Sequence, residues 1–346
     1  MTLIDQYLDK ARVDFLQKVK DKGAEHLYDC LDLSKQKHMN TEYFLKKIEK
    51  AKIFTEPPNE SAKNGQTVAA MDKEMNTISG IFFRAVDMIL KDCVKPNVIY
   101  ANGISEKELG DLVADKLKEE GVNYEGDYSE FGFTQGSFTN LCEKKIIDRF
   151  GLLSDALILY YEAMRKRFFQ CSDFKIWVEE GKNDGATNTL LGNDFWNTLI
   201  TISTVDFEDL IILLLKGDDN SAKAKAVTVN KEMKKFWEDH GVQFKIEIDP
   251  PVCKFVNWFW EEDGAYPDIV HRTLKVISKL FESEKELLEY QTSIKDFLRA
   301  FRTYTEKIKA ISCAAKYYKC EENMVAYMCD YLYHFAWYPT EKLWAE

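Results

Sequence analysis

The sequence contains no apolar stretch that approaches the ~20 residues a transmembrane helix requires. No signal-peptide pattern opens it either, so we expect no direct membrane span. Its eight cysteines are scattered without paired short spacing, and its five histidines show neither metal-ligand nor catalytic-triad spacing. Zinc binding is therefore not expected, and free thiols in a reducing compartment fit better. No internal repeat or low-complexity tract is found.

An excess of positive charge is also lacking. The chain has 58 acidic against 47 basic residues, a net charge of −11, which argues against a generally adhesive nucleic-acid surface. RNA binding remains compatible with this charge if basic residues line a channel, because phosphate contacts are local. Three basic stretches are candidates, although each is more typical of a solvated helix face: residues 46–52, 165–167 and 223–235. By length, 346 residues could form two domains or one continuous body.

What the sequence does contain is an unbroken apolar run, Leu210–Leu215, followed directly by Lys216, Gly217, Asp218 and Asp219. The run is short, aliphatic and ended by a turn signal, which predicts a buried strand. Two adjacent aspartates at its tip repel each other unless a cation neutralises them, and oxygen ligands favour Mg²⁺ or Mn²⁺. An ordinary hairpin turn is the alternative, since Gly and Asp are common turn residues.

A second candidate acid, Asp127, lies upstream where a predicted strand over residues 122–127 gives way to a helix with apolar spacing from Phe138 to Phe150. If that strand lies beside the 210–215 strand, Asp127 and Asp218 meet across 91 residues of chain. Three carboxylates gathered there would hold two divalent ions ~3.5–4 Å apart, the arrangement of in-line phosphoryl transfer. Taken alone, Asp127 is equally well explained as a solvated turn acid.

Between these acids, a polar loop containing Gly185 leads into a predicted helix. Thr189, Asn193 and Asn197 recur there at spacings of four and so share one helix face. Such a face can hydrogen-bond a sugar or a template backbone. The alternative is a polar outer face, which the surrounding apolar residues weaken: Leu190, Leu191, Phe195, Trp196, Leu199 and Ile200.

The rest of the chain is mostly helical in pattern. Residues 1–60 and 284–336 carry apolar residues at spacings of three and four. A helix begins at Ser105 with Glu108 in capping-box spacing. A helix near residues 229–239 precedes a strand near 242–248.

Taken in order, these patterns resemble the palm motifs of viral RNA-dependent RNA polymerases. The resemblance is to the alphavirus-like supergroup, with its hepatitis-E-like and plant-virus-like positive-strand RNA viruses. Asp127-x-Ser129-x-Phe131-x-x-Thr134-Gln135 resembles motif A, residues 185–197 resemble motif B, and Lys216-Gly217-Asp218-Asp219 resembles motif C. Residues 255–280 resemble motif E and the start of the thumb, and residues 65–85 the end of the fingers.

The resemblance implies an α+β right-hand polymerase, rich in helix, with an antiparallel palm sheet flanked by helices. It assigns the fingers to residues 1–120 with an insertion at 151–182, the palm to 121–150 (motif A) and 183–262 (motifs B to E), and the thumb to 263–346. The implied activity is template-directed RNA synthesis by two-metal nucleotidyl transfer.

The resemblance also implies roles for single residues. Asp127 and Asp218 would ligate two Mg²⁺ or Mn²⁺ ions with help from Asp219. Asn193, Thr189 and the Gly185 loop would contact the nucleotide or the template, where the 2′-hydroxyl separates RNA from DNA. Lys245 is a candidate proton donor to pyrophosphate, and Lys63 a candidate triphosphate contact.

The partners implied are an RNA template, a primer or product strand, nucleoside triphosphates, and other viral replication proteins such as a helicase and a capping enzyme. The expected location is the host cell cytoplasm, in membrane-associated replication complexes reached through those partners.

Two positions depart from the family pattern. Gly132 stands where a second motif A aspartate is usual, and Asp184 stands where Ser or Thr usually precedes the motif B glycine. They leave open a catalytically silent polymerase-like protein that binds RNA or scaffolds a replication complex. A reverse transcriptase is disfavoured, because Asn193 and Gly217 match the RNA-polymerase pattern.

Overall fold

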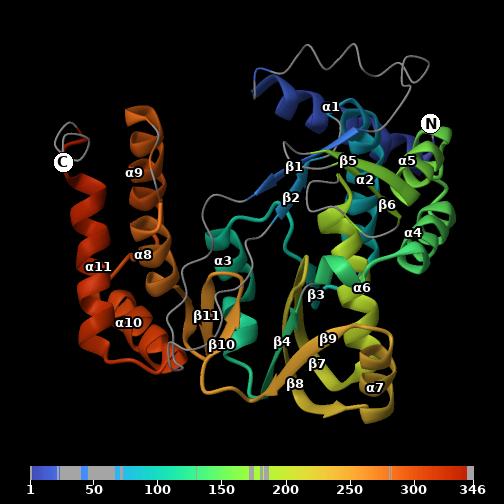
Figure 1. The fold of residues 1–346 in the computed structure, drawn as a ribbon. Coiled ribbons are helices and arrows are strands. Elements are labelled where there is room, and N and C mark those ends of the chain that lie inside the picture. The colour runs from blue at the N-terminus through green and yellow to red at the C-terminus, as the bar shows by residue number, and fades with distance from the viewer. Residues whose placement is uncertain are drawn as a thin grey trace.

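A computed structural model gives the fold of the protein (Figure 1). It describes residues 2–21, 23, 40–45, 67–70, 73–129, 131–170, 175–179, 182, 187–279, 281 and 283–340. Within these ranges the strands form three sheets of five, four and three strands.

The five-stranded sheet, which we call the central sheet, has the order β3-β7-β8-β4-β9. Its strands are β3 (Val98–Tyr100), β4 (Val122–Ser129), β7 (Val205–Lys216), β8 (Asp219–Val229) and β9 (Gln243–Ile248). All neighbours are antiparallel except β3, which runs parallel to β7 at one edge. The predicted strands near 122–127, 210–215 and 242–248 are therefore confirmed.

One condition stated from the sequence is not met directly. Asp127 and Asp218 were expected to meet if the strand carrying Asp127 lay beside the 210–215 strand, but β8 lies between β4 and β7. The reason is local, because β7 turns back tightly into β8, and a hairpin partner takes the adjacent place in a sheet. β7 is also longer than the apolar run 210–215, since it begins at Val205.

Both faces of the central sheet are covered, which explains the unbroken apolar run in β7. Ile212 and Leu214 pack in a cluster with residues of α3 (Glu106–Leu117). Leu213 and Leu215 point to the opposite face. On that side, α6 (Thr189–Thr204) and α7 (Lys231–Asp239) pack over the end of β4 and over β9 through Trp196 and Trp237.

The N-terminal half adds a helical layer and the four-stranded sheet. The helices are α1 (Leu3–Asp21), α2 (Lys73–Cys93), α4 (Ser137–Arg149) and α5 (Asp155–Arg165). The sheet has the order β2-β1-β5-β6, formed by β2 (Thr67–Ala70), β1 (Asn40–Leu45), β5 (Lys166–Gln170) and β6 (Lys175–Glu179). The expectation that residues 1–60 are helical is confirmed at α1 but wrong at β1. The segment there, Asn-Thr-Glu-Tyr-Phe-Leu, contains β-branched and aromatic residues that favour strands.

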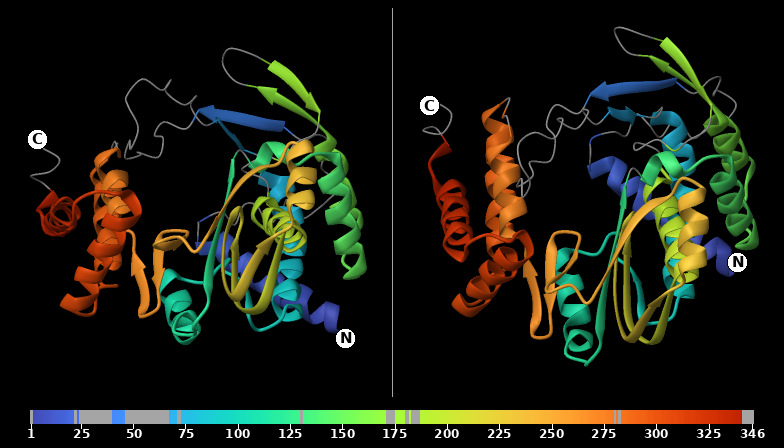
Figure 2. Two further views of the ribbon diagram at one scale, coloured as in Figure 1. Left: turned by 90° about the horizontal axis from the view of Figure 1, so that it is seen from below. Right: turned by 60° about the horizontal axis from the view of Figure 1, so that its bottom comes forward.

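The C-terminal helices are joined to the central sheet by a three-stranded ribbon: β10 (Cys253–Phe255), β11 (Trp258–Glu261) and β12 (Gly264–Pro267). The helices are α8 (Ile269–Ile277), α9 (Glu284–Leu298), α10 (Tyr304–Tyr318) and α11 (Glu322–Trp337). They share one hydrophobic core. Figures 1 and 2 show them grouped on one side of the molecule, with the ribbon between them and the central sheet. The helical pattern predicted for 284–336 is confirmed as three helices.

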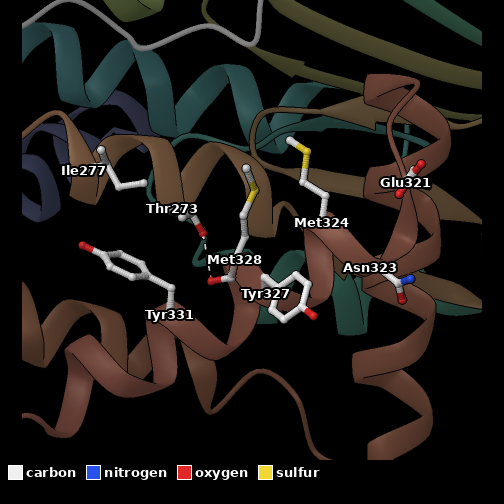
Figure 3. A pocket seen from close by; sticks show the side chains of 8 residues that line it. All are labelled: Thr273, Ile277, Glu321, Asn323, Met324, Tyr327, Met328 and Tyr331. Carbon is white, nitrogen blue, oxygen red and sulfur yellow. Dashed lines mark hydrogen bonds between the residues drawn. The ribbon is translucent and has the colours of Figure 1, made fainter.

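A hollow of about 430 Å³ lies on the surface of these helices, between α8 and α11 (Figure 3). Its lining is mainly apolar and aromatic, with Glu321 as its acidic member. The hydroxyl of Thr273 donates to the carbonyl of Met328 at 3.3 Å and ties the two helices together. With one carboxylate, this hollow does not have the acidic composition expected of a phosphoryl-transfer site.

The face of α4 differs from its apolar pattern. Phe138 and Leu141 belong to the apolar spacing of this helix, but they are 65% and 50% exposed. The buried residues are instead Thr139, Asn140, Glu143 and Ile147. Glu143, on this inward face, forms a buried ion pair with Lys182.

Six cysteines lie within the described ranges, and each is a free thiol. No helix in these ranges combines the length and apolar character needed to cross a bilayer.

Candidate active site

A two-residue turn joins β7 and β8. Lys216 pairs with Asp219 across the hairpin, so Gly217 and Asp218 form its tip. Gly217 has a φ of 64°, a conformation that favours glycine. A side chain at this position would also press on Leu190 of α6, whose Cδ1 would lie 3.1 Å from the added Cβ. The turn therefore favours glycine at the first position of Gly-Asp-Asp. The two acids that follow, Asp218 and Asp219, are both exposed and point outward.

Buried side chains of α6 hold the backbone of this turn. Asp194 Oδ1 accepts from the Gly217 amide at 2.6 Å. Asn197 Nδ2 donates to the carbonyls of Gly217 and Asp219, each at 3.0 Å. Asn197 Oδ1 accepts from Asn220 Nδ2 at 2.8 Å. Each of these contacts to the 217–220 segment is made by a fully buried side chain, so the two exposed carboxylates stand on a fixed support.

Asp194 is an acid of a different kind. It is fully buried and also accepts a hydrogen bond from Asn102 Nδ2. Burial raises its pKa to about 7, against the lowering effect of the hydrogen bonds from Gly217 and Asn102. Sequence reasoning missed Asp194 and assigned Asn197 to the substrate face of the helix. The available signal was an acid flanked by Leu191 and Trp196 in a helix with little exposed surface.

Asp127 of β4 lies at the same end of the central-sheet strands as the β7–β8 turn. The β4–β8 pairing ends with Gly126 opposite Asn220, so Asp127 and Asp219 are the next residues in register. On its other side, Asp127 lies directly opposite Lys245 of β9. Residues opposite each other in antiparallel strands point to the same face, so the Asp127 and Lys245 side chains share one face. Asp127 and Lys245 are both exposed.

Lys245 forms an ion pair with Glu247 on the same strand. The hydrogen bond and the charge of Glu247 raise the pKa of Lys245, and the charge of Asp127 acts in the same direction. Lys245 therefore carries its proton at neutral pH.

Of the remaining predicted residues, some lie within the described ranges and some lie outside them. Asn193 of α6 is half-buried and its Oδ1 accepts from Gln135 Nε2 at 2.7 Å. Thr189 is the first residue of α6. Gly185, Lys63 and the departing position Asp184 lie outside the described residues. Gly132 lies in the short helix η3 (Phe131–Thr134), which follows β4.

The acids at this edge suit a hard divalent cation, because they offer exposed oxygen donors on a held backbone. Among the residues that the structure describes, no three acidic, histidine or cysteine side chains are close enough to hold a metal ion by themselves. Mg²⁺ is usually bound by one or two carboxylates together with substrate phosphates, and two neighbouring aspartates satisfy that need. The gathering of all three carboxylates around two ions stays a prediction.

Comparison with known proteins gives a consistent result. A family model described as RNA-dependent RNA polymerase matches residues 5–339. The replicase of Beet necrotic yellow vein virus (isolate Japan/S) is 25% identical over 311 residues, which cover 86% of this chain and 14% of the replicase. The non-structural polyprotein pORF1 of avian hepatitis E virus is 24% identical over 280 residues, which cover 80% of this chain and 18% of the polyprotein.

Among solved structures, the RNA-dependent RNA polymerase of a human picorbirnavirus superposes with a TM-score of 0.54 at 11% sequence identity. The match covers 73% of this chain and 52% of that polymerase. The chain thus spans less than a fifth of the two curated relatives and about half of this solved structure.

Proposed function

The chain belongs to the RNA-dependent RNA polymerase family, and on that premise we propose that it extends an RNA strand on an RNA template with nucleoside triphosphates. Its likeness to the viral replicase and polyprotein confirms the alphavirus-like membership predicted from the sequence. Its likeness to a solved polymerase confirms the α+β right-hand fold. The proposed role is replication of a positive-strand RNA genome.

The observation that carries this proposal is the place of three exposed acids. The pairing of β4 with β8 ends at Gly126 opposite Asn220, so Asp127 and Asp219 are the next residues in register. Asp218 stands at the tip of the same hairpin. They come from segments 91 residues apart in sequence. The turn that bears two of them is fixed by buried hydrogen bonds rather than left to solvent. A solvated loop would not need that support.

In the proposed reaction Asp127 and Asp218 would hold two Mg²⁺ or Mn²⁺ ions, with Asp219 as a further oxygen donor. Such ions, when bound, lower the pKa of the primer 3′-hydroxyl and stabilise charge on the triphosphate. The task of the chain is to fix the carboxylates: Asp194 and Asn197 do so for the hairpin turn, and the ladders on both sides of β4 do so for Asp127. Lys245 carries a proton beside Asp127 and is the proposed donor to pyrophosphate.

Asn193 and Thr189 are the proposed nucleotide contacts on α6. Asn193 immediately precedes Asp194, which holds Gly217. Its partner Gln135 belongs to the segment that follows the Asp127 strand. Asn193 is therefore hydrogen-bonded to the segment that follows Asp127, and its neighbour Asp194 is hydrogen-bonded to the turn that bears Asp218. Gly185 and Lys63 complete the proposed nucleotide and template contacts.

We assign the subdomains as the sequence predicted: fingers at residues 1–120 and 151–182, palm at 121–150 and 183–262, and thumb at 263–346. The central sheet supports the palm assignment, and the separate hydrophobic core of α8–α11 supports the thumb. The matched relatives are named as a replicase and a non-structural polyprotein. We therefore propose that the chain works with other replication proteins, such as a helicase and a capping enzyme. The proposed location is the host cytoplasm, with membranes reached through those partners.

Primer extension tests this proposal. The protein is incubated with an RNA primer–template and either ribo- or deoxynucleoside triphosphates, in Mg²⁺ and in Mn²⁺. We expect ribonucleotide incorporation that Asp218→Ala lowers roughly a thousandfold, since metal-held charge stabilisation is worth several kcal/mol. Asp206→Ala is the matched control, because Asp206 is an exposed acid at the far end of β7 and should leave incorporation unchanged.

Three results would oppose the proposal in different ways. Equal background incorporation by the protein and by Asp218→Ala, with RNA still bound, would support the catalytically silent scaffold. Preferential use of deoxynucleotides would support a reverse transcriptase. An equal loss in Asp206→Ala would show that the assay reports folding rather than chemistry.

A further inference from the structure

Two consecutive buried hydrogen bonds connect Lys182 to Asn193 through Gln135. Lys182 Nζ donates to Gln135 Oε1 at 3.0 Å, and Gln135 Nε2 donates to Asn193 Oδ1 at 2.7 Å. The Gln135 side chain is 1% exposed, so water has little access to replace either bond. The three residues come from three separate segments: the stretch before α6, the stretch after η3, and α6 itself. We call this series the Lys182 relay.

Lys182 is locked in place by a buried ion pair. Its amino group lies 2.5 Å from Glu143 Oε1, and the two side chains are 2% and 5% exposed. The other oxygen of Glu143 accepts from Tyr161 OH at 3.1 Å and from Asn188 Nδ2 at 2.7 Å. Four segments thus fix the position of the lysine, which a surface ion pair would not do.

Gly192 makes room for this amino group within α6. A Cβ at Gly192 would overlap both Lys182 Nζ and Glu143 Oε1. Because Gly192 has no side chain, the Lys182–Glu143 ion pair can pack against α6 one residue before Asn193. A glycine in a helix interior costs stability, and the space it gives to Lys182 explains why it stands here.

The chemistry of lysine sets the direction of the relay. An ammonium group donates hydrogen bonds and accepts none, so the atom of Gln135 that faces it must be the oxygen. Gln135 then presents its NH₂ group to Asn193, which must answer with its own oxygen. The carbonyl of Phe131 also accepts from Gln135 Nε2 at 3.4 Å and favours the same orientation. Asn193 is left with its NH₂ group to offer elsewhere.

We propose that Lys182 and Gln135 are positioning residues for nucleotide selection: they orient Asn193 so that it presents an N–H donor, rather than an acceptor, to the ribose 2′-oxygen. This inference rests on the proposed function, because it takes Asn193 as a nucleotide contact. Gln135 donates to Asn193 and is therefore the group that orients it in this chain.

An isosteric substitution reverses the direction of the relay. Gln135→Glu keeps the shape and can still accept from Lys182, but it cannot donate to Asn193. Asn193 must then turn its NH₂ group toward Glu at position 135 and show its oxygen to the nucleotide. A 2′-fluoro group accepts hydrogen bonds weakly and donates none, whereas a 2′-amino group can donate. The variant should therefore disfavour 2′-fluoro relative to 2′-amino nucleotides.

The experiment measures equilibrium binding of 2′-hydroxyl, 2′-fluoro and 2′-amino nucleoside triphosphates to the protein with an RNA template and a primer that lacks a 3′-hydroxyl. No incorporation occurs, so the readout does not depend on turnover. We expect Gln135→Glu to lower the ratio of 2′-fluoro to 2′-amino affinity by roughly three- to tenfold, the value of one hydrogen bond. A merely structural role for Gln135 would weaken all three nucleotides together.

Two further variants guard the result. Gln291→Glu makes the same change in a thumb glutamine that is also buried and also donates two hydrogen bonds, and it should leave the ratio unchanged. If Gln135→Glu does not fold, the double substitution Lys182→Met and Glu143→Gln removes the fixed direction without leaving a lone buried charge. In that variant the 2′-fluoro to 2′-amino ratio should also change, because Gln135 can then adopt either orientation.

The outcomes separate this inference from the proposed function. Nucleotide binding by the parent protein with an unchanged ratio in folded Gln135→Glu overturns the relay and leaves the polymerase proposal standing. The absence of any template-dependent nucleotide binding by the parent protein contradicts the proposed function, and the relay is overturned with it. A shifted ratio in Gln135→Glu but not in Gln291→Glu supports the inference.

Discussion

At the scale of single residues, the acids of this site fall into two kinds with opposite surroundings. Asp127, Asp218 and Asp219 are exposed, as donors to a cation need to be. Asp194 is buried and serves the backbone of the turn. Composition and spacing pointed to the exposed acids, because they follow strands at turn positions. The buried acid gave no such signal, since its role depends on a turn 23 residues later in the chain.

Asp194→Asn should change how stability depends on pH. In the folded protein burial raises the pKa of Asp194 to about 7, whereas the ordinary pKa of an aspartate is 3.8. The stabilising contribution is thus fully present below about pH 4 and is lost as the pH rises through 7. Asn keeps the acceptor for Gly217 and has no proton to lose. We expect the variant to gain about 2 kcal/mol on the parent between pH 5 and pH 8, measured by urea unfolding.

Parallel pH profiles of the parent and Asp194→Asn would contradict this account of Asp194. Asp206→Asn is the matched control on the exposed part of β7 and should follow the parent at both pH values. Because Asn102 Oδ1 is a buried acceptor without a hydrogen bond, rotation of the Asn102 amide can accommodate the new NH₂ group.

Two helix glycines provide a matched test of the Lys182 ion pair. Gly192→Ala places a methyl group on Lys182 Nζ and Glu143 Oε1, whereas the same change at Gly110 of α3 meets its nearest neighbours at 3.7 and 3.8 Å. We expect Gly192→Ala to lower the free energy of unfolding by about 2–3 kcal/mol through overpacking and displacement of a buried pair. Gly110→Ala should be neutral or stabilising by up to ~1 kcal/mol. Equal effects in thermal or urea unfolding would show that Lys182 moves aside at no cost.

At the scale of elements, periodicity identified the strands and helices that carry the site, and long-range contacts decided the rest. β4, α6, β7, β9 and the C-terminal helices were predictable because each combines a regular apolar pattern with turn residues at its ends. The order of strands was not, since β8 was expected after Gly217 but not between β4 and β7. The inward face of α4 was also missed, because Glu143 is buried by its pairing with Lys182 and not by its own pattern.

One partly buried lysine joins the ribbon to the C-terminal helices α8–α11. Lys254 of β10 pairs with Asp268, the N-cap of α8, at 2.7 Å, and the Asp268 side chain is 0% exposed. Its amino group also lies over the rings of Phe259, Tyr317 and Tyr318. Its backbone amide donates to Glu125 of β4 at 3.0 Å, two residues before Asp127. The strand that carries Asp127 is thus connected to the C-terminal helices through Lys254.

Lys254→Met should therefore destabilise the protein strongly. It leaves a buried carboxylate without its cation, a change that costs about 3–5 kcal/mol in comparable pairs. Lys285→Met is the control, because that lysine is 87% exposed and lies 3.9 Å from Glu289, where a loss below ~0.5 kcal/mol is expected. Urea unfolding measures both. A loss at Lys254 no larger than at Lys285 would show that this contact does not hold the ribbon to the C-terminal helices.

At the scale of the whole molecule, the chain forms a compact hand from a small part of its relatives' length. It matches 14% and 18% of the two viral proteins and yet carries its own central sheet, its ribbon and the hydrophobic core of α8–α11. Its net charge of −11 gives no general attraction for RNA. What distinguishes it is one edge of the central sheet, where acids from two distant segments share a face. The sequence order of the motifs predicted this edge, while the hydrogen bonds that support it emerged only from the fold.

The central claim is that Asp127 and the Asp218–Asp219 turn bind the same divalent ions, and metal-directed cleavage tests it most directly. Fe²⁺ replaces Mg²⁺ in the protein with primer–template RNA and nucleotide, and ascorbate with peroxide then generates radicals that cut the chain beside the bound ion. We expect two cuts, one near Asp127 and one near Asp218, both suppressed by excess Mg²⁺ and both lost in Asp218→Asn. Cleavage confined to one of these segments, or an unchanged pattern in Asp218→Asn, would contradict the shared metal site.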